Sequence, residues 1–168
     1  MLKKEIEKAL NTHLNEEFFS ANLYLSISAY FSSIDLPGFA HWMKIQYEEE
    51  TFHGMKFLDF IDIRGGRVKI EGIKKPEFEW KSPLDAFEEA FKHEQYISSR
   101  INDLVDLALK ERDHALNNFL QWFVSEQMEE EATTNGIFQK LKKMKDSATS
   151  LLMLDQELAG RVFTPPAK

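Results

Sequence analysis

Apolar residues recur along the chain at alternating steps of three and four, which is the spacing of one face of an α-helix. Breaks in this pattern fall at the few glycine and proline positions, such as Pro37-Gly38 and Gly65-Gly66. Ser82-Pro83 suits a helix start, with Ser82 as the N-cap and Pro83 in the first turn. The pattern predicts an all-α chain with four long helices and a short fifth one. They cover about residues 4–33, 39–64, 83–110, 114–143 and 147–160.

The connections between these helices predict the topology. Most are short, so neighbouring helices can pair antiparallel, but Gly65 to Lys81 separates the second and third helices. That segment is long enough to travel the length of a bundle, which distinguishes this chain from a simple up-down bundle. We expect residues 1–168 to form a single domain, with the bundle at about 4–143 and the short helix at about 147–160.

In each of the four long predicted helices, the residues at steps of three and four form a core-facing row, which we call its ladder. Polar residues interrupt each ladder near its middle. Depth along a helix grows by about 1.5 Å per residue, and these interruptions fall near the midpoints of all four long helices. We therefore expect their side chains to meet at one level inside the bundle. They are Glu17 on the first helix, Gln46, Glu50 and His53 on the second, Glu94 on the third, and Gln127 and Glu130 on the fourth.

A single glutamate on an apolar ladder is more often a boundary residue than a ligand, because glutamate is rarely fully buried unless it is paired. Four carboxylates at one depth are different, since each unmatched buried ion costs several kcal/mol. No lysine or arginine occupies the four ladders. The carboxylates must therefore be protonated or bind cations, and two divalent ions would balance four of them. We favour a metal site.

The spacing of the second-helix residues supports this interpretation. Glu50 and His53 are three residues apart, so both side chains can reach one site. Oxygen-rich ligation with one imidazole suits iron or manganese rather than copper(I) or structural zinc. A bridging glutamate would hold two metals close together and permit paired one-electron oxidations by one O₂. A second string of this type, Glu111-x-x-His114, lies off the ladder, and we interpret it as solvated surface.

Composition excludes several other classes of protein. The chain has no cysteine, so a disulfide scaffold, a thiol nucleophile and a cysteine-ligated iron–sulfur cluster are excluded. A formal net charge of −7 makes nucleic acid an unfavourable partner. Neither a secretory signal nor an apolar stretch long enough for a membrane span is present in the sequence. We expect a cytoplasmic location and no membrane partner.

Four segments together resemble the prokaryotic non-haem ferritins, and the resemblance covers nearly the whole chain. They are Leu14–Tyr24 (LNEEFFSANLY), Tyr47–His53 (YEEETFH), His93–Ile97 (HEQYI) and Phe119–Glu131 (FLQWFVSEQMEEE). The resemblance implies a ferritin-like four-helix bundle with an intra-subunit di-iron centre. It also implies assembly of about twenty-four identical subunits into a hollow shell, in which the fifth helix lines the four-fold axes.

Matching positions imply roles for individual residues. The first iron position corresponds to Glu17, Glu50 and His53, and the second to Glu50, Glu94 and Glu130, with Glu50 as the bridge and Gln127 as a neighbouring polar contact. A third, transient iron position corresponds to Glu49, Glu126 and Glu129. Tyr24 and Trp122 match aromatic residues that can supply electrons to bound oxygen species, although core packing is an equally good interpretation of Trp122. The other histidines (His13, His41, His93 and His114) lie off the ladders and receive no role.

Single positions separate this chain from related families. Bacterioferritins carry a second E-x-x-H motif on the fourth helix, whereas Gln127-Met128-Glu129-Glu130 lacks the histidine, so we expect no haem. Rubrerythrins need a cysteine-ligated iron domain, and the dodecameric relatives lack a fifth helix. Here the fifth helix has an apolar side formed by Leu151, Leu154 and Leu158.

The function implied is iron storage with ferroxidase activity, in which Fe(II) is oxidised by O₂ or H₂O₂ and the ferric mineral is kept inside the shell. Two alternatives remain. A di-iron oxidase acting on an organic substrate would usually show two E-x-x-H motifs and an apolar substrate cavity. A non-catalytic helical interaction protein would leave buried carboxylates at one depth unexplained.

Overall fold

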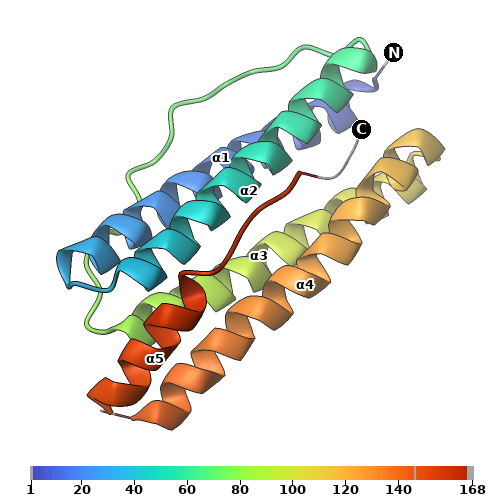
Figure 1. Ribbon diagram of the computed structural model, residues 1–168. Helices are drawn as coiled ribbons and strands as arrows, with labels where there is room; N and C mark the ends of the chain where they lie inside the picture. Colours follow the sequence, from blue (N-terminus) through green and yellow to red (C-terminus); the bar gives the residue numbers. More distant parts are fainter. Residues whose placement is uncertain (1, 146, 166–168) are drawn as a thin grey trace.

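The structure is a computed structural model that describes residues 2–145 and 147–165. Its helices are α1 (Lys4–Ser33), α2 (Pro37–Ile63), α3 (Pro83–Lys110), α4 (His114–Met144) and α5 (Ala148–Leu158), and the described residues contain no strand. The helices α1 and α2 form one antiparallel pair, and α3 and α4 form the other (Figure 1). The predicted all-α bundle is confirmed.

Side-chain caps begin three of the helices. Ser82 accepts a hydrogen bond from the amide of Asp85 at the start of α3, as the sequence predicted. Asp113 and Ser147 play the same role for α4 and α5. Ser147 is therefore a cap that precedes α5 rather than its first residue.

The predicted start of the second helix near Phe39 is two residues late. One carboxylate oxygen of Asp155, in α5, accepts hydrogen bonds from the amides of Gly38 (2.8 Å) and Phe39 (3.0 Å). These amides are free donors of the first helical turn, and Pro37 ahead of them has no N–H to satisfy. A side chain from a distant helix thus completes the α2 start, and local sequence did not reveal it.

The long connection between α2 and α3 runs along the outside of α1 in an extended conformation (Figure 1). Two asparagine side chains of α1 form hydrogen bonds with this extended backbone, as a neighbouring strand would. Asn11 bonds the Arg67 carbonyl and the Lys69 amide, at 3.0 and 2.6 Å. Asn15 bonds the Lys69 carbonyl and the Glu71 amide, both at 2.8 Å. These bonds satisfy backbone groups that a helix or sheet would otherwise satisfy, and the predicted long crossover is confirmed.

The core consists of two apolar clusters. One, at the end where α5 docks, includes Phe31, Phe39, Met43 and Phe87. The other, at the opposite end, includes Leu14, Phe57, Leu120 and Phe123. Along each long helix, buried polar side chains near the middle separate the residues of one cluster from those of the other. They are Glu17 on α1, Gln46, Glu50 and His53 on α2, Glu94 on α3, and Gln127 and Glu130 on α4. The bundle therefore contains a polar layer between two hydrophobic halves.

The apolar side of α5 is used within the chain. Leu154 and Leu158 are buried in the first cluster, and Leu151 packs against it. Leu152 and Met153, on the other side, are 56% and 67% exposed. The apolar side predicted for the fifth helix therefore packs within the chain, because α5 lies tightly against α2.

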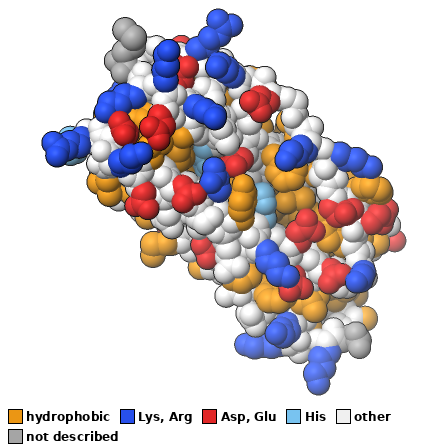
Figure 2. All heavy atoms as spheres, turned by 180° about the vertical axis from the view of Figure 1, so that it is seen from behind, with side chains coloured by type: hydrophobic (Ala, Val, Ile, Leu, Met, Phe, Trp, Pro, Cys, Tyr) orange, Lys and Arg blue, Asp and Glu red, His pale blue; other side chains and the backbone are white. Residues whose placement is uncertain are grey.

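The surface carries charges of both signs. On the face seen from behind in Figure 2, acidic and basic side chains are interspersed, with apolar patches between them. Among the described residues, no helix combines the length and the apolar character needed to cross a membrane.

Candidate metal centre

The polar layer brings together every residue that the ladder pattern placed at mid-bundle. Glu17 comes from α1, Glu50 and His53 from α2, Glu94 from α3 and Glu130 from α4, and each is at most 5% exposed. No lysine or arginine is among the buried residues of the described chain. A group of carboxylates without internal cations is costly in a low-dielectric interior, so the arrangement requires protons or metal ions.

Glu17, Glu50 and His53 form a close group, with one potential ligand atom from each lying within 4.8 Å of the others. The His53 Nδ1 atom is 3.4 Å from a carboxylate oxygen of Glu50 and 3.9 Å from Oε2 of Glu17. Within the described protein, neither His53 Nδ1 nor Glu17 Oε2 has a hydrogen-bond partner. Buried polar atoms are rarely left unpaired, and a cation between these atoms would satisfy both. The donor set fits a divalent iron ion.

A glutamine joins this group to α4. The Gln46 amide nitrogen donates to Glu50 Oε1 at 3.1 Å and to Glu130 Oε2 at 2.8 Å, which ties the two carboxylates together. Glu94 is held from two other sides, by the Tyr24 hydroxyl and by the Gln127 amide nitrogen at 3.0 Å. Glu94 belongs to neither of the two close groups found among the described residues. The second set (Glu50, Glu94 and Glu130) therefore shares the layer but is less tightly gathered.

His13 is a buried neighbour of the site that the sequence interpretation missed. It is 1% exposed, and its Nε2 atom lies 2.8 Å from Oε1 of Glu17, while its ring packs edge-on to Phe57. The expectation that His13 lies off the ladder and has no role does not anticipate this burial. Its position three residues after Leu10 and four before Glu17 places it on the same helix face, and that spacing could have revealed it. Gln46 was on the ladder but received no role.

The ionisation of the layer follows from burial and crowding. Burial, together with the charges of Glu17 and Glu130, raises the pKa of Glu50 to about 8, although His53 opposes the shift. Burial and the Glu50 and Glu130 carboxylates also raise the pKa of Glu94 well above its usual value. Burial disfavours charge on His53, but the nearby Glu50 carboxylate outweighs burial and raises the pKa of His53 to about 10. Without a cation, the layer therefore holds protons at neutral pH.

Glu17 is the exception in this layer. Burial raises its pKa, but the charge of His13 and the hydrogen bond from it outweigh burial, so the pKa of Glu17 falls below the usual value. Burial also opposes protonation of His13, yet Glu17 raises the pKa of His13 to about 9. His13 and Glu17 thus form an ion pair that keeps one ligand carboxylate ionised.

The residues expected at a third position are in different surroundings. Glu126 lies close to His53 and Glu130, and these three form the second close group. Glu49 is paired with Arg161, a residue beyond α5. Glu129 is exposed.

Trp122 stands edge-on to His53, with ring centres 5.4 Å apart, and Lys56 lies 4.2 Å above the Trp122 ring.

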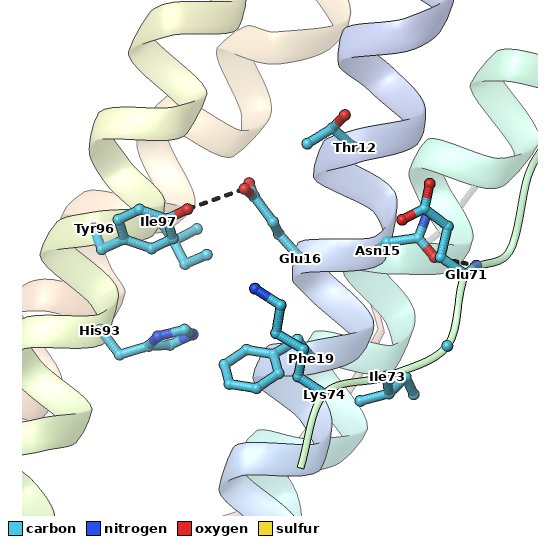
Figure 3. Close-up of a pocket in the computed structure, with 11 residues that line it drawn as sticks. Thr12, Asn15, Glu16, Phe19, Glu71, Ile73, Lys74, His93, Tyr96 and Ile97 are labelled. Atoms are coloured by element: carbon cyan, nitrogen blue, oxygen red, sulfur yellow. Dashed lines mark hydrogen bonds between the residues drawn. The ribbon is translucent and has the colours of Figure 1, made fainter. Parts of the chain in front are cut away.

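A pocket of about 330 Å³ opens beside the layer, between α1, α3 and the crossover (Figure 3). Glu16, Tyr96 and His93 line it, and the Tyr96 hydroxyl donates to Glu16 at 3.0 Å. Glu16 also lies 3.4 Å from Nδ1 of His13. The pocket is therefore separated from Glu17 by a single imidazole.

The second E-x-x-H string is far from this layer. Glu111 follows α3 and pairs with Lys3 at 2.8 Å, whereas exposed His114 begins α4. Its interpretation as surface is confirmed.

Comparison with known proteins identifies the family. The ferritin-like domain model matches residues 7–144. A bacterial non-heme ferritin of Bacteroides fragilis is 41% identical over 161 residues, covering 96% of this chain and all of the relative. One of Campylobacter jejuni is 40% identical and covers 93% of each chain. An open-pore ferritin structure from the archaeon Archaeoglobus fulgidus has a TM-score of 0.95 at 46% identity, covering 96% of this chain and all of the other. A humanized archaeal ferritin reaches 0.97 at 48% identity, covering 98% and 100%. The chain belongs to the ferritin family.

Proposed function

We propose that this protein stores iron and oxidises Fe(II) to Fe(III) at the buried polar layer, with O₂ or H₂O₂ as the oxidant. The observation that carries the proposal is the pair of unpartnered buried atoms, Glu17 Oε2 and His53 Nδ1, directed at one position beside Glu50. Membership of the ferritin family supports iron as the metal. Iron is here the substrate and cargo of the protein.

We assign the positions as follows. Glu17, Glu50 and His53 bind the first Fe(II), and Glu50, Glu94 and Glu130 bind the second, with Glu50 shared. Gln127 holds Glu94 and contacts the second position, and Tyr24 donates to Glu94 from the other side. Glu49, Glu126 and Glu129 form a third, transient position.

The layer can perform the reaction because it pairs the substrate ions. Each Fe(II) gives up one electron, so two neighbouring ions supply the two electrons that convert O₂, with two protons, into H₂O₂. Glu50 and Glu94 hold protons in the metal-free layer, and these must leave as Fe(II) binds. The apolar clusters on both sides keep bulk water away from the reacting ions.

The storage function requires assembly, and we propose a hollow homo-oligomer of about twenty-four subunits in the cytoplasm. Because Leu154 and Leu158 are used within the chain, the exposed Leu152 and Met153 on α5 are the apolar residues available there for a neighbouring subunit. We also propose that the protein carries no haem, since Glu130 stands where a second E-x-x-H motif would have its histidine.

Size-exclusion chromatography followed by anaerobic iron loading and exposure to air tests this function. We expect a particle near twenty-four subunits that purifies without a Soret band. On exposure to air it should retain many ferric ions per subunit in soluble form. A monomer or dimer at micromolar concentration would contradict the assembly. Iron that precipitates as fast as it does without protein would contradict storage.

A further inference from the structure

The chain that follows α5 crosses back over the bundle. We call residues 159–165 the C-terminal strap, and in Figure 1 this segment leaves α5 and passes between α2 and α4. The Arg161 carbonyl lies 2.8 Å from Nε2 of His41. Farther along, Phe163 packs edge-on to Phe52, with ring centres 5.7 Å apart. The strap is thus attached to α2 at two places about three helical turns apart.

Between these attachments, the Arg161 guanidinium is held from three sides. It forms an ion pair with Glu49, lies 4.0 Å above the ring of Trp42, and donates to the Trp42 carbonyl at 3.4 Å. The Arg161 and Glu49 side chains are only 16% and 14% exposed. Planar guanidinium groups suit this combination of stacking and ion pairing. The Arg161–Glu49 ion pair is therefore supported by further contacts of the guanidinium, unlike an isolated ion pair on the surface.

Glu49 is one of the carboxylates assigned to the third metal position. It lies within electrostatic reach of Glu126 and Glu130, and Glu126 in turn approaches His53. In this structure, the positive charge beside Glu49 is the guanidinium of Arg161. A metal ion that used Glu49 as a ligand would compete with the guanidinium for the same oxygens.

We propose that the Arg161 guanidinium competes with metal ions for Glu49. A metal ion therefore occupies the third position only after displacing the guanidinium. This inference rests on the proposed function and deepens it. Arg161 thereby makes the third position the last to fill, after the buried layer. It also links occupation of that position to release of the C-terminal strap.

Displacement is feasible because both side chains keep some contact with solvent, so that a metal ion can reach Glu49. Holding two long side chains in one geometry also costs conformational entropy, which lowers the net free energy of the ion pair. A divalent ion carries twice the charge of a guanidinium and would meet several carboxylates together. The Arg161–Glu49 ion pair therefore competes with a metal ion for Glu49 but does not prevent the ion from binding.

Calorimetric titration with Zn(II), a redox-inactive probe, tests the proposal on the full-length protein. The third binding step is defined as the one that Glu49→Gln removes. Arg161→Gln should tighten this step about fivefold, since it removes a competing pair of modest strength. Lys92→Gln is the matched control. It makes the same charge change in the exposed Lys92–Glu88 pair on α3 and should leave the step unchanged.

The outcomes separate this inference from the proposed function. An unchanged or weaker third step in Arg161→Gln would overturn the inference, because Arg161 would then be neutral or would help to build the position. Glu17→Ala is titrated beside the wild type. If Glu17→Ala binds Zn(II) as the wild type does, it is the proposed function that fails.

A second measurement uses the wild-type protein and does not depend on a variant folding. Phenylglyoxal modifies free guanidinium groups, and mass spectrometry locates the modified residues. Saturation with Zn(II) should accelerate the labelling of Arg161. Arg64, which pairs with Asp113 at 2.9 Å near the α3–α4 turn, is the internal control and should be unaffected. Equal or slower labelling of Arg161 in the presence of Zn(II) would overturn the inference.

Discussion

His13 and Glu17 share a 2.8 Å contact one helical turn apart, inside a layer where both side chains are 1% exposed. The imidazole uses one oxygen of Glu17, and the other oxygen remains directed at His53. His13 therefore orients a ligand carboxylate and keeps it ionised, without itself reaching the proposed metal position. This arrangement gives a direct prediction.

Replacing His13 by leucine should weaken binding at the first metal position. Charge-assisted hydrogen bonds contribute about 1.5–3 kcal/mol, so we expect a loss of about ten- to a hundredfold in Zn(II) affinity. His13→Gln retains a donor and should recover part of the affinity. Calorimetric titration of the three proteins measures the effect. Equal affinities for leucine and wild type would show that Glu17 needs no support from His13.

The stability of the metal-free protein should decrease as pH rises from about 5 to 8. Glu50 has its pKa raised to about 8 by burial and by neighbouring carboxylates. The folded state therefore holds a proton on Glu50 that the unfolded chain releases near its ordinary pKa, and this stabilisation is lost as pH rises through about 8. His53, whose pKa is raised to about 10 chiefly by Glu50, extends the loss to higher pH. Differential scanning calorimetry at several pH values measures the trend.

Glu50→Gln provides the control for this pH dependence. Glutamine cannot ionise, so the loss between about pH 5 and 8 should become shallower in the variant. If the wild type and Glu50→Gln follow parallel curves, Glu50 is not the group responsible.

Gly38 should tolerate no side chain, because a Cβ atom there would lie 1.7 Å from the Asp155 carbonyl oxygen. Gly38→Ala must push α5 away from α2, which would disturb the Asp155 cap and the burial of Leu154. We expect a loss of about 2–4 kcal/mol in the free energy of unfolding, as for other overpacked contacts and lost caps.

Gly136→Ala is the matched control for Gly38→Ala. Gly136 also lies within a helix, but a Cβ atom there meets nothing within 4 Å. The higher helix propensity of alanine should raise stability by up to about 1 kcal/mol. Chemical denaturation of both variants checks the contrast, and similar stability changes in the two would refute the close approach of α5.

Much of this architecture could be predicted from the sequence because it depends on local periodicity. The ladder spacing located the helices and the depth of Glu17, Glu50, Glu94 and Glu130, since both follow from the rise of a helix. Contacts between distant segments were not predictable in this way. The Asp155 cap on α2 and the Arg161 pair with Glu49 each join residues more than 100 positions apart. No local pattern specifies such pairings.

His13 shows a different limit of the sequence pattern. It lies on the same side of α1 as Leu10 and Glu17, but a ladder written as one residue per turn includes Leu14 and omits it. A buried helix face is wider than such a ladder. Polar residues at its margin are therefore easily assigned to the surface.

The central claim is that Glu50 is shared by both iron positions. Glu50→Ala should remove a ligand from each position, whereas Glu17→Ala and Glu130→Ala should each affect only one. The apo form of Glu50→Ala should remain at least as heat-stable as the wild type, because a crowded, desolvated carboxylate is removed. Glu49→Ala should keep rapid oxidation and change only later turnover.

Stopped-flow absorbance of anaerobically loaded protein, mixed with oxygenated buffer, tests this claim most directly. With two Fe(II) per subunit, the wild type should show a rapid phase of paired oxidation, and Glu50→Ala should lose it while remaining folded by calorimetry. An unchanged rapid phase in Glu50→Ala would contradict the assignment of Glu50 as the bridge between two iron ions.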